Sequence, residues 1–480
     1  MQNKIEIFNN QVIINYNLAY PKSREVLLKS HTFAKFVQYF IEYQETDNAN
    51  MYAYLTKNGE LSSKEAAYDF CHFLRLLSIF TCEELKDEYY LSDKDATLDV
   101  IEEMYRTWRS LQRFGYMKSD NSTDFGINTL VAFDSASNDL FLRTYRLFEE
   151  KLMGRPNLVY RQVQAGTNAC FSIHTLDKVW ADEYAALQDI PMIDTVMLRT
   201  PMILHPKSSK RTGMFTEIDT QPMTYFNKGE SNWFCYPCKV GALLCFVYFN
   251  SKYMSSALSM ANLFELATKE ESAQKPDLVV IFGNDDGNDD TNFYYDEAND
   301  IWVGCISDNP RIEYFGYLKK MCLTLHNLAQ MKKGWLPIHG AFVNIYLKDG
   351  TKKGIMLMGD SGAGKSESIE ALKAAAGDMI REVEVVFDDM GTIHLEDGVP
   401  YGQGTEIGAF IRLDDLDPGT PYRDMDRSIF MAPENPNARM IQPAAPYRVV
   451  VHNHKIDLFA YANNYTNEFG LKKLTAQEVK

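Results

Sequence analysis

The sequence contains no apolar run long enough to span a membrane, since a spanning helix needs about 20 such residues. Its longest candidate, VGALLCFVYF at Val240–Phe249, is too short and predicts a buried strand. The N-terminal segment MQNKIEIFNNQVIINYNLAY lacks the charged region and the apolar stretch of a signal peptide. We therefore expect neither a membrane partner nor a secretory leader.

Positive charge is also scarce. The chain has 49 Lys and Arg residues against 65 Asp and Glu residues, which gives a net charge of -16. Proteins that bind nucleic acid present a basic footprint to the phosphate backbone, so we expect no nucleic-acid partner. A local basic pocket for a nucleotide or a small anionic metabolite is compatible with this charge.

The eight cysteines do not form a metal-binding framework. Cys235 and Cys238 have ligand spacing in CYPC, but a four-thiolate zinc site needs a second such pair, and the sequence has none. We interpret these two residues as buried thiols. Scattered cysteines suit a reducing compartment, so the expected location is cytoplasmic.

The patterns that are present predict an α/β (α+β) multidomain protein of 480 residues. Residues 1–150 have mostly helical patterns, residues 151–280 are β-rich with turn residues between the strands, and residues 281–480 form a third domain. Ser62 and Glu65 have the spacing of a capping box. The helices that we predict most directly are Ser23–Glu45, Ser62–Phe80, Ala96–Tyr116 and Ser255–Gln274.

Two further segments lie in or beside the β-rich region. MTYFNKG, which ends at Gly229, belongs to its predicted strands. The acidic stretch Phe282–Val303 superficially resembles a calcium loop, but its spacing fails the EF-hand template and its twelfth position carries no Glu. We interpret it as an exposed hairpin or loop.

The stretch GIMLMGDSGAGKSESIEAL, which begins at Gly354, predicts a strand, a glycine-rich turn and a helix. It matches G-x-x-x-x-G-K-[ST] in full, the pattern whose backbone N–H groups, lysine and hydroxyl hold nucleotide phosphates and Mg²⁺. The helix start adds the positive end of its dipole. The predicted nucleotide-binding residues are Gly359, Asp360, Ser361, Gly362, Ala363, Gly364, Lys365, Ser366 and Glu367.

A phosphate loop also needs a carboxylate on a neighbouring strand. VEVVF predicts such a strand, with Asp388 and Asp389 at its C-terminal edge. One carboxylate can bind the metal, while the other orients water or accepts a proton.

GDSGAGKSE at Gly359–Glu367 resembles the P-loop of HPr kinase/phosphorylase. The preceding IHGAFVNI and the later FDDMG resemble segments that HPr kinases share with phosphoenolpyruvate (PEP) carboxykinases. GTEIGAFIRLDDLDPG and ENPNARMIQP resemble carboxykinase segments, and the whole run is similar to bacterial PEP carboxykinase-like proteins. The resemblance covers His339 to Asn464, and the first 280 residues carry none.

The resemblance implies a nucleotide-binding domain with a mixed sheet, in which the P-loop follows antiparallel strands. It implies ATP and Mg²⁺ or Mn²⁺ as cofactors. Lys365, Asp388, Arg439 and His339 would be catalytic, with Arg439 on the transferred group. The metal-facing residues would be Ser366, Asp389, Asp388, His339 and Glu406.

The chain departs from carboxykinases in two places. MKKG lies well before the His in that family, whereas here Lys333 is close to His339, so Lys332 and Lys333 can instead be helix C-terminal charges. The signature TGRSxKDK is missing, and HPKSSKRTG offers Lys207, Lys210 and Arg211 in a different order.

Three functions remain open on this basis. The first is a carboxykinase that converts oxaloacetate and ATP to PEP, ADP and CO₂. The second is an HPr-kinase-like enzyme that phosphorylates a protein serine or a small-molecule hydroxyl, with Asp388 accepting the proton. The third is a catalytically silent nucleotide sensor.

Overall fold

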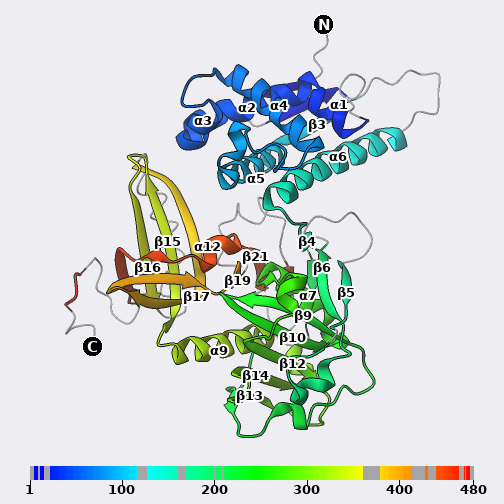
Figure 1. Cartoon of the computed structure of the whole chain (residues 1–480), viewed down its shortest axis with the longest axis vertical. Coiled ribbons are helices and arrows are strands. Elements are labelled where there is room, and N and C mark those ends of the chain that lie inside the picture. The colour runs from blue at the N-terminus through cyan, green and yellow to red at the C-terminus, as the bar shows by residue number, and fades with distance from the viewer. Residues whose placement is uncertain are drawn as a thin grey trace. The chain divides into compact units, whose positions relative to one another are not determined.

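The computed structural model describes most of the chain, namely residues 5–8, 11–15, 22–116, 127–160, 169–176, 178–198, 202–204, 206, 210–359, 379–412, 428–430, 439–463, 470 and 472–475. These residues form a mixed α/β structure (Figure 1). The chain divides into two compact units, Met1–Asn157 and Leu158–Lys480. The first boundary lies close to the predicted one. The predicted boundary after residue 280 falls inside the strand β12 (Leu278–Asn284).

The N-terminal unit is mainly helical. Apolar side chains at helical spacing bury one face of each helix in a shared core. A capping box of Ser62 and Glu65 begins α4, as predicted. The predicted third helix ends earlier, because the chain continues from Leu111 into a strand. The elements are α1 (Arg24–Lys29), α2 (His31–Asp47), α3 (Ala49–Leu55), α4 (Ser63–Ile79), α5 (Lys94–Ser110), α6 (Ile127–Met153) and the sheet β1 (Ile5–Phe8), β2 (Gln11–Asn15), β3 (Gln112–Tyr116).

Two glutamates meet between α5 and α6 in this unit. Glu102 hydrogen-bonds Glu149, and Tyr145 donates to the two Glu102 oxygens at 2.9 and 3.0 Å. Burial, followed by the charge of Glu149, raises the pKa of Glu102 to about 8. Burial raises the pKa of Glu149 as well, so the pair as a whole keeps a proton above the ordinary range of a glutamate.

This pair predicts a pH-dependent stability. Glu102 has an ordinary pKa of about 4.3 when unfolded, so the folded unit holds a proton that the unfolded chain releases above that value. The free energy of unfolding should therefore fall as the pH rises from about 4.3 to about 8. Glu102→Gln should flatten this dependence. Urea unfolding can be followed by the fluorotryptophan NMR signal of Trp108, which stacks on Phe141 of α6. An equally steep dependence in the variant would contradict the assignment.

The second unit is built on a ten-stranded mixed sheet with the order β4-β6-β9-β10-β12-β14-β13-β8, to which β5 and β11 are attached. Its inner strands are apolar on both faces, as expected for strands that are covered on both sides. The strands are β4 (Val159–Tyr160), β5 (Ala169–His174), β6 (Met192–Leu198), β8 (Thr216–Glu217), β9 (Trp233–Val240), β10 (Leu243–Asn250), β11 (Glu265–Leu266), β12, β13 (Thr291–Asp296) and β14 (Ile301–Ser307).

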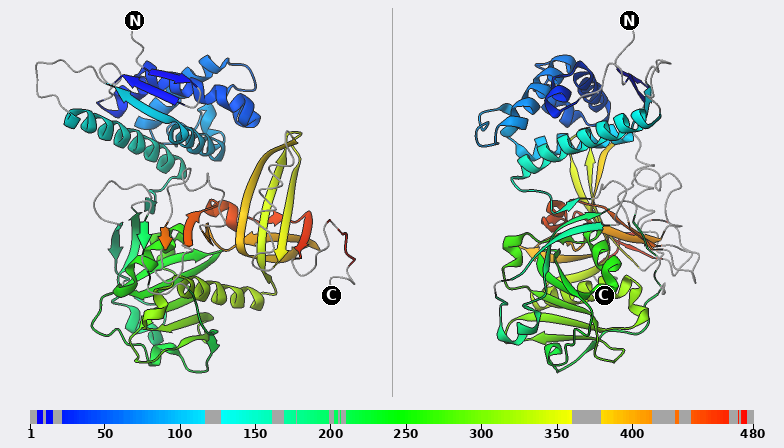
Figure 2. Two further views of the ribbon diagram at one scale, coloured as in Figure 1. Left: turned by 180° about the vertical axis from the view of Figure 1, so that it is seen from behind. Right: turned by 90° about the vertical axis from the view of Figure 1, so that its right-hand side faces the viewer.

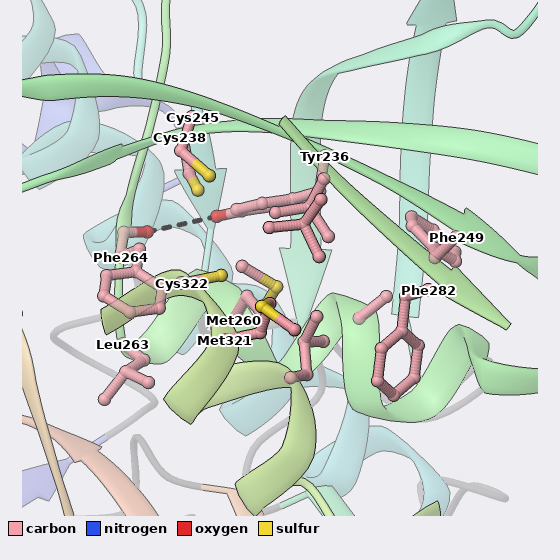
Figure 3. Packing of buried hydrophobic residues seen from close by; sticks show 14 of the residues in the cluster. Tyr236, Cys238, Cys245, Phe249, Met260, Leu263, Phe264, Phe282, Met321 and Cys322 are labelled. Atoms are coloured by element: carbon pink, nitrogen blue, oxygen red, sulfur yellow. Dashed lines mark hydrogen bonds between the residues drawn. The ribbon is translucent and has the colours of Figure 1, made fainter. Parts of the chain in front are cut away.

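One face of this sheet packs against helix α9 (Gly316–Lys332) in a dense core. Figure 3 shows Cys238, Cys245 and Cys322 close together there, with Tyr236 donating to the Phe264 carbonyl at 3.2 Å. Cys235 belongs to the core of the opposite face. The CYPC residues are therefore buried thiols, as interpreted, and they point away from each other.

Two sequence predictions in this unit are wrong, and a third is confirmed. MTYFNKG forms no strand, because a 3₁₀ turn occupies Pro222–Thr224. The predicted helix Ser255–Gln274 is interrupted: α7 (Met254–Ser259) ends early, and Thr268 with Glu271 forms a new capping box that starts α8 (Lys269–Ser272). The acidic stretch does form a hairpin, between β13 and β14.

A six-stranded mixed sheet carries the long strands seen in Figures 1 and 2, in the order β22-β18-β17-β15-β16-β23. Strands β15, β16 and β17 are antiparallel neighbours, whereas β16 and β23 are parallel. The bounds are β15 (Leu336–Leu347), β16 (Lys352–Gly359), β17 (Ile380–Glu396), β18 (Val399–Gly404), β22 (His454–Lys455) and β23 (Leu458–Ala462), with α12 (Tyr447–Val451) beside them.

A four-stranded sheet completes the unit, with the order β19-β21-β20-β7. Its strands are β7 (Met202–Leu204), β19 (Gly408–Arg412), β20 (Ser428–Phe430) and β21 (Arg439–Pro443). Within the described ranges, no helix combines the length and apolar character needed to cross a membrane.

Candidate functional site

Helix α9 brings a lysine into the protein interior. Its buried face includes Phe315 just before it, then Lys319, Cys322 and Leu323, which recur at helical spacing. Helix α9 as a whole packs against β12 and β14. The Lys319 side chain is only 1% exposed, whereas its neighbour Lys320 is 42% exposed. A fully buried lysine requires a charged partner, because an unpaired buried ammonium is costly.

The partner carboxylate lies on β17. Asp389 stands opposite Gly340 of β15 and has a backbone φ of 117°, a conformation that residues other than glycine rarely adopt. A Cβ on Gly340 would lie 2.4 Å from the Leu357 carbonyl oxygen, so the strands approach too closely here for a larger residue. Backbone strain of this kind persists only where the surroundings hold the residue firmly.

Three cationic or potentially cationic groups surround Asp389. Lys319 Nζ donates to Asp389 Oδ2 at 2.6 Å, and Lys320 Nζ lies 3.4 Å from the same oxygen. His339 Nε2 lies 3.0 Å from Asp389 Oδ1, and its side chain is 43% exposed. The carboxylate is thus fixed through both oxygens, while His339 and Lys320 face solvent.

A second carboxylate completes the cluster on the buried side. Glu406 Oε1 lies 3.0 Å from Lys319 Nζ, and the Glu406 side chain is buried. The Phe410 ring lies next to this group, with Lys319 Nζ 5.6 Å and the Arg439 guanidinium carbon 5.7 Å from the ring centroid. Arg439 therefore shares an aromatic neighbour with Lys319.

The pKa directions follow from this arrangement. Burial alone would raise the pKa of Asp389, but the Lys319 charge and the His339 hydrogen bond hold it well below its usual range. Burial would lower the pKa of Lys319, but Glu406 and Asp389 raise it above its usual value. Burial raises the pKa of Glu406 to about 7, against the opposing charge of Lys319. At pH 8, we therefore expect all three groups to be largely charged.

The structure brings together His339, Asp389, Glu406 and the neighbourhood of Arg439, as the sequence predicts. Gly359 is the last residue of β16, which pairs with β15 up to Gly340. The other predicted nucleotide-binding residues lie outside the described residues: Asp360, Ser361, Gly362, Ala363, Gly364, Lys365, Ser366 and Glu367.

The Asp pair differs from its prediction in position. Asp388 and Asp389 were expected at the end of a strand, but β17 continues to Glu396 and places them near its middle. The strand continues because Gly391, Thr392 and Ile393 pair with both β15 and β18, and the next three residues pair with β18. Asp388 is half-buried and stands opposite Ala341.

The basic segment near residue 210 contacts the start of helix α9. The Thr212 N–H donates to the Tyr317 hydroxyl at 3.0 Å, and Tyr317 lies in the first turn of α9. Arg211 lies over the Phe215 ring, at 4.8 Å from the centroid. Lys207 lies outside the described residues. The end of this segment thus contacts α9 at Tyr317, which points to a different side of the helix from Lys319.

No protein-family model matches the chain, and no curated protein sequence matches it either. In the described part of the chain, no group of three or more His, Cys, Asp or Glu side chains is arranged to hold a metal ion. Asp389 nevertheless offers a carboxylate, a ligand type that suits Mg²⁺ or Mn²⁺, and His339 places an imidazole nitrogen, a ligand type for transition metals, 3.0 Å from it. The further predicted ligand, Ser366, lies outside the described residues.

Sequence reasoning missed three basic residues. It considered Lys332 and Lys333, which are the last residue and the C-cap of α9 as the alternative reading expected. The lysines that contact Asp389 are Lys319 and Lys320. The sequence feature that could have identified Lys319 is its position among the apolar residues of a helix. Arg412 stands opposite Arg439 in the β19–β21 register.

Proposed function

We propose that the chain is a nucleotide-dependent phosphotransferase of the PEP carboxykinase type, which converts oxaloacetate and ATP to PEP, ADP and CO₂. The observation that carries the proposal is the cluster around Asp389. It brings Lys319 and Lys320 of α9 and His339 of β15 to Asp389 of β17. The other neighbour of β15 is β16, which ends at Gly359, where the phosphate-loop motif begins.

The proposal assigns phosphate binding to the loop that follows Gly359. Lys365 neutralises the β- and γ-phosphates, and Ser366 with Asp389 and His339 holds Mg²⁺ or Mn²⁺. When bound, the metal ion neutralises phosphate charge and polarises substrate oxygens. Arg439, with Arg412 opposite it in the strand register, binds the transferred phosphoryl group.

The chemistry balances without a further reagent. The bond from C3 of oxaloacetate to its carboxylate breaks, CO₂ leaves, and the electron pair remains as the enolate of pyruvate. The enolate oxygen attacks the γ-phosphorus and ADP departs. Lys320 is half-exposed and sits beside Asp389, so it can place positive charge next to the enolate oxygen. Positioning and charge stabilisation account for the catalysis.

A second candidate is a kinase that acts on a hydroxyl group. The observation that favours it is that α9 ends at Lys332 and β15 follows almost at once, as expected for the helix-then-His approach of HPr-kinase-like proteins. Asp388 would then accept the hydroxyl proton. Asp388→Asn should abolish this activity.

The test is phosphorus NMR of the protein with ATP, Mg²⁺ and Mn²⁺, with and without oxaloacetate. A PEP signal that requires oxaloacetate is the expected result. Lys365→Ala should remove it, whereas Lys353→Ala should not, because Lys353 is an exposed residue of β16 that pairs with Asp457. ATP consumption that ignores oxaloacetate would favour the hydroxyl kinase, and bound but intact ATP would indicate a sensor.

A further inference from the structure

The segment that carries Glu406 is held on several sides by hydrogen bonds. It connects β18 to β19, and it is anchored to the ten-stranded sheet, to the segment after β21 and to β17. The bonds run from the Gly241 N–H to the Thr405 carbonyl (2.8 Å), from the Ile407 N–H to the Leu263 carbonyl (2.9 Å), from the Ala444 N–H to the Ile407 carbonyl (2.7 Å) and from the Thr405 hydroxyl to the Met390 carbonyl (2.9 Å). The backbone of Glu406 is thus fixed relative to Asp389, the neighbour of Met390.

The Glu406 carboxylate has one charged neighbour at short range. Its Oε1 is 3.0 Å from Lys319 Nζ, and the side chain is 3% exposed. Within the described residues, neither Glu406 oxygen has a hydrogen-bond partner of good geometry. Such a group is costly to bury. Its interaction with Lys319 is therefore electrostatic, and its position is maintained by the backbone bonds.

The charges around Asp389 make this second carboxylate important. Lys319 and Lys320 both approach Asp389 Oδ2, at 2.6 and 3.4 Å. Without Glu406, two ammonium groups would face one carboxylate, and a divalent cation at that carboxylate would meet net positive charge. With Glu406 ionised, Lys319 is balanced on its buried side. Lys320 is partly solvated, so its charge is screened.

We infer that Glu406 is a positioning residue that neutralises and fixes Lys319, so that the positive charge around Asp389 does not exclude a divalent cation from that carboxylate. This role rests on the proposed function and differs from direct metal ligation by Glu406. The role requires that Glu406 be negatively charged and that its carboxylate lie close to Lys319. An uncharged side chain of the same shape therefore cannot replace it.

The test measures Mn²⁺ binding at pH 8 by electron paramagnetic resonance of the free ion. Glu406→Gln should weaken Mn²⁺ binding at least tenfold. In the PEP-forming reaction, the KM for Mn²⁺ should rise by a similar factor, while kcat at saturating Mn²⁺ changes less than threefold. Glu271→Gln is the matched control. It removes a glutamate from another lysine pair, 3.1 Å from Lys239, and should leave Mn²⁺ affinity unchanged.

A double variant separates this role from a structural one. In the Lys319→Met background, Glu406→Gln should change Mn²⁺ affinity less than threefold, because the charge that it balances is gone. The double variant removes the charges of both Lys319 and Glu406, so it does not leave Glu406 as an uncompensated buried charge. A tenfold loss of Mn²⁺ affinity on Glu406→Gln in the Lys319→Met background would overturn this inference. So would an unchanged Mn²⁺ affinity of the Glu406→Gln single variant. Neither result would bear on the proposed function. A wild-type protein that binds no Mn²⁺ and transfers no phosphoryl group overturns the proposed function as well.

Discussion

Lys319→Ala should lower the free energy of unfolding of the Leu158–Lys480 unit by about 3–5 kcal/mol, the usual cost of removing one partner from a buried ion pair. Lys319 is 1% exposed and touches two carboxylates, Asp389 and Glu406. Its removal leaves the buried Glu406 without its close cation, whereas Asp389 keeps Lys320 and His339. The two carboxylates then repel each other, or one takes up a proton, and either response destabilises the folded state.

The adjacent lysine provides the control. Lys320 is 42% exposed and lies 3.4 Å from Asp389, so Lys320→Ala should cost less than about 1 kcal/mol. Urea unfolding can be followed by the fluorotryptophan NMR signal of Trp302 in β14, the strand on which α9 packs. Equal costs for the two variants would mean that the buried ion pairs do not stabilise this unit.

Asp389→Asn should reduce kcat for PEP formation by about 10³-fold or more, a loss at or beyond the upper end for a single electrostatic group in an active site. The amide keeps the shape of the side chain but removes the charge that gathers Lys319, Lys320 and His339. It also removes a ligand oxygen of the type that a divalent metal prefers. The measurement is the initial rate of oxaloacetate-dependent PEP formation.

The control for this variant is Asp397→Asn. Asp397 is exposed in the turn between β17 and β18, with φ of 50°, which asparagine tolerates well. It should leave kcat within about twofold, since it lies outside the cluster. If Asp389→Asn retained more than a tenth of the activity, the cluster would have no part in the chemistry.

Local signals predicted the parts of the fold that local chemistry determines. The capping box at Ser62 and the strand before the phosphate loop are examples, because their residues interact within a few positions of each other. The break after Ser259 was missed because residues 257–267 are buried on nearly all sides, and an apolar run of this kind has no periodicity to read.

In the candidate site, too, local motifs identify residues, whereas contacts between distant segments determine the geometry. His339, Asp389 and Glu406 follow from motifs, but their mutual distances depend on pairing between β15 and β17 and on the packing of α9. Lys319 was missed because its role depends on two carboxylates that lie 70 and 87 positions further along the chain. No local pattern encodes such contacts.

Asp389 lies in a strand of seventeen residues whose backbone pairs with β15 on both sides of it. Enzymes often complete their active sites by closing a loop over the substrate. A carboxylate inside a strand ladder cannot travel with such a loop. In this chain, any gating motion must therefore be made by other groups. The amide hydrogens around Asp389 should exchange slowly with solvent whether or not a ligand is bound.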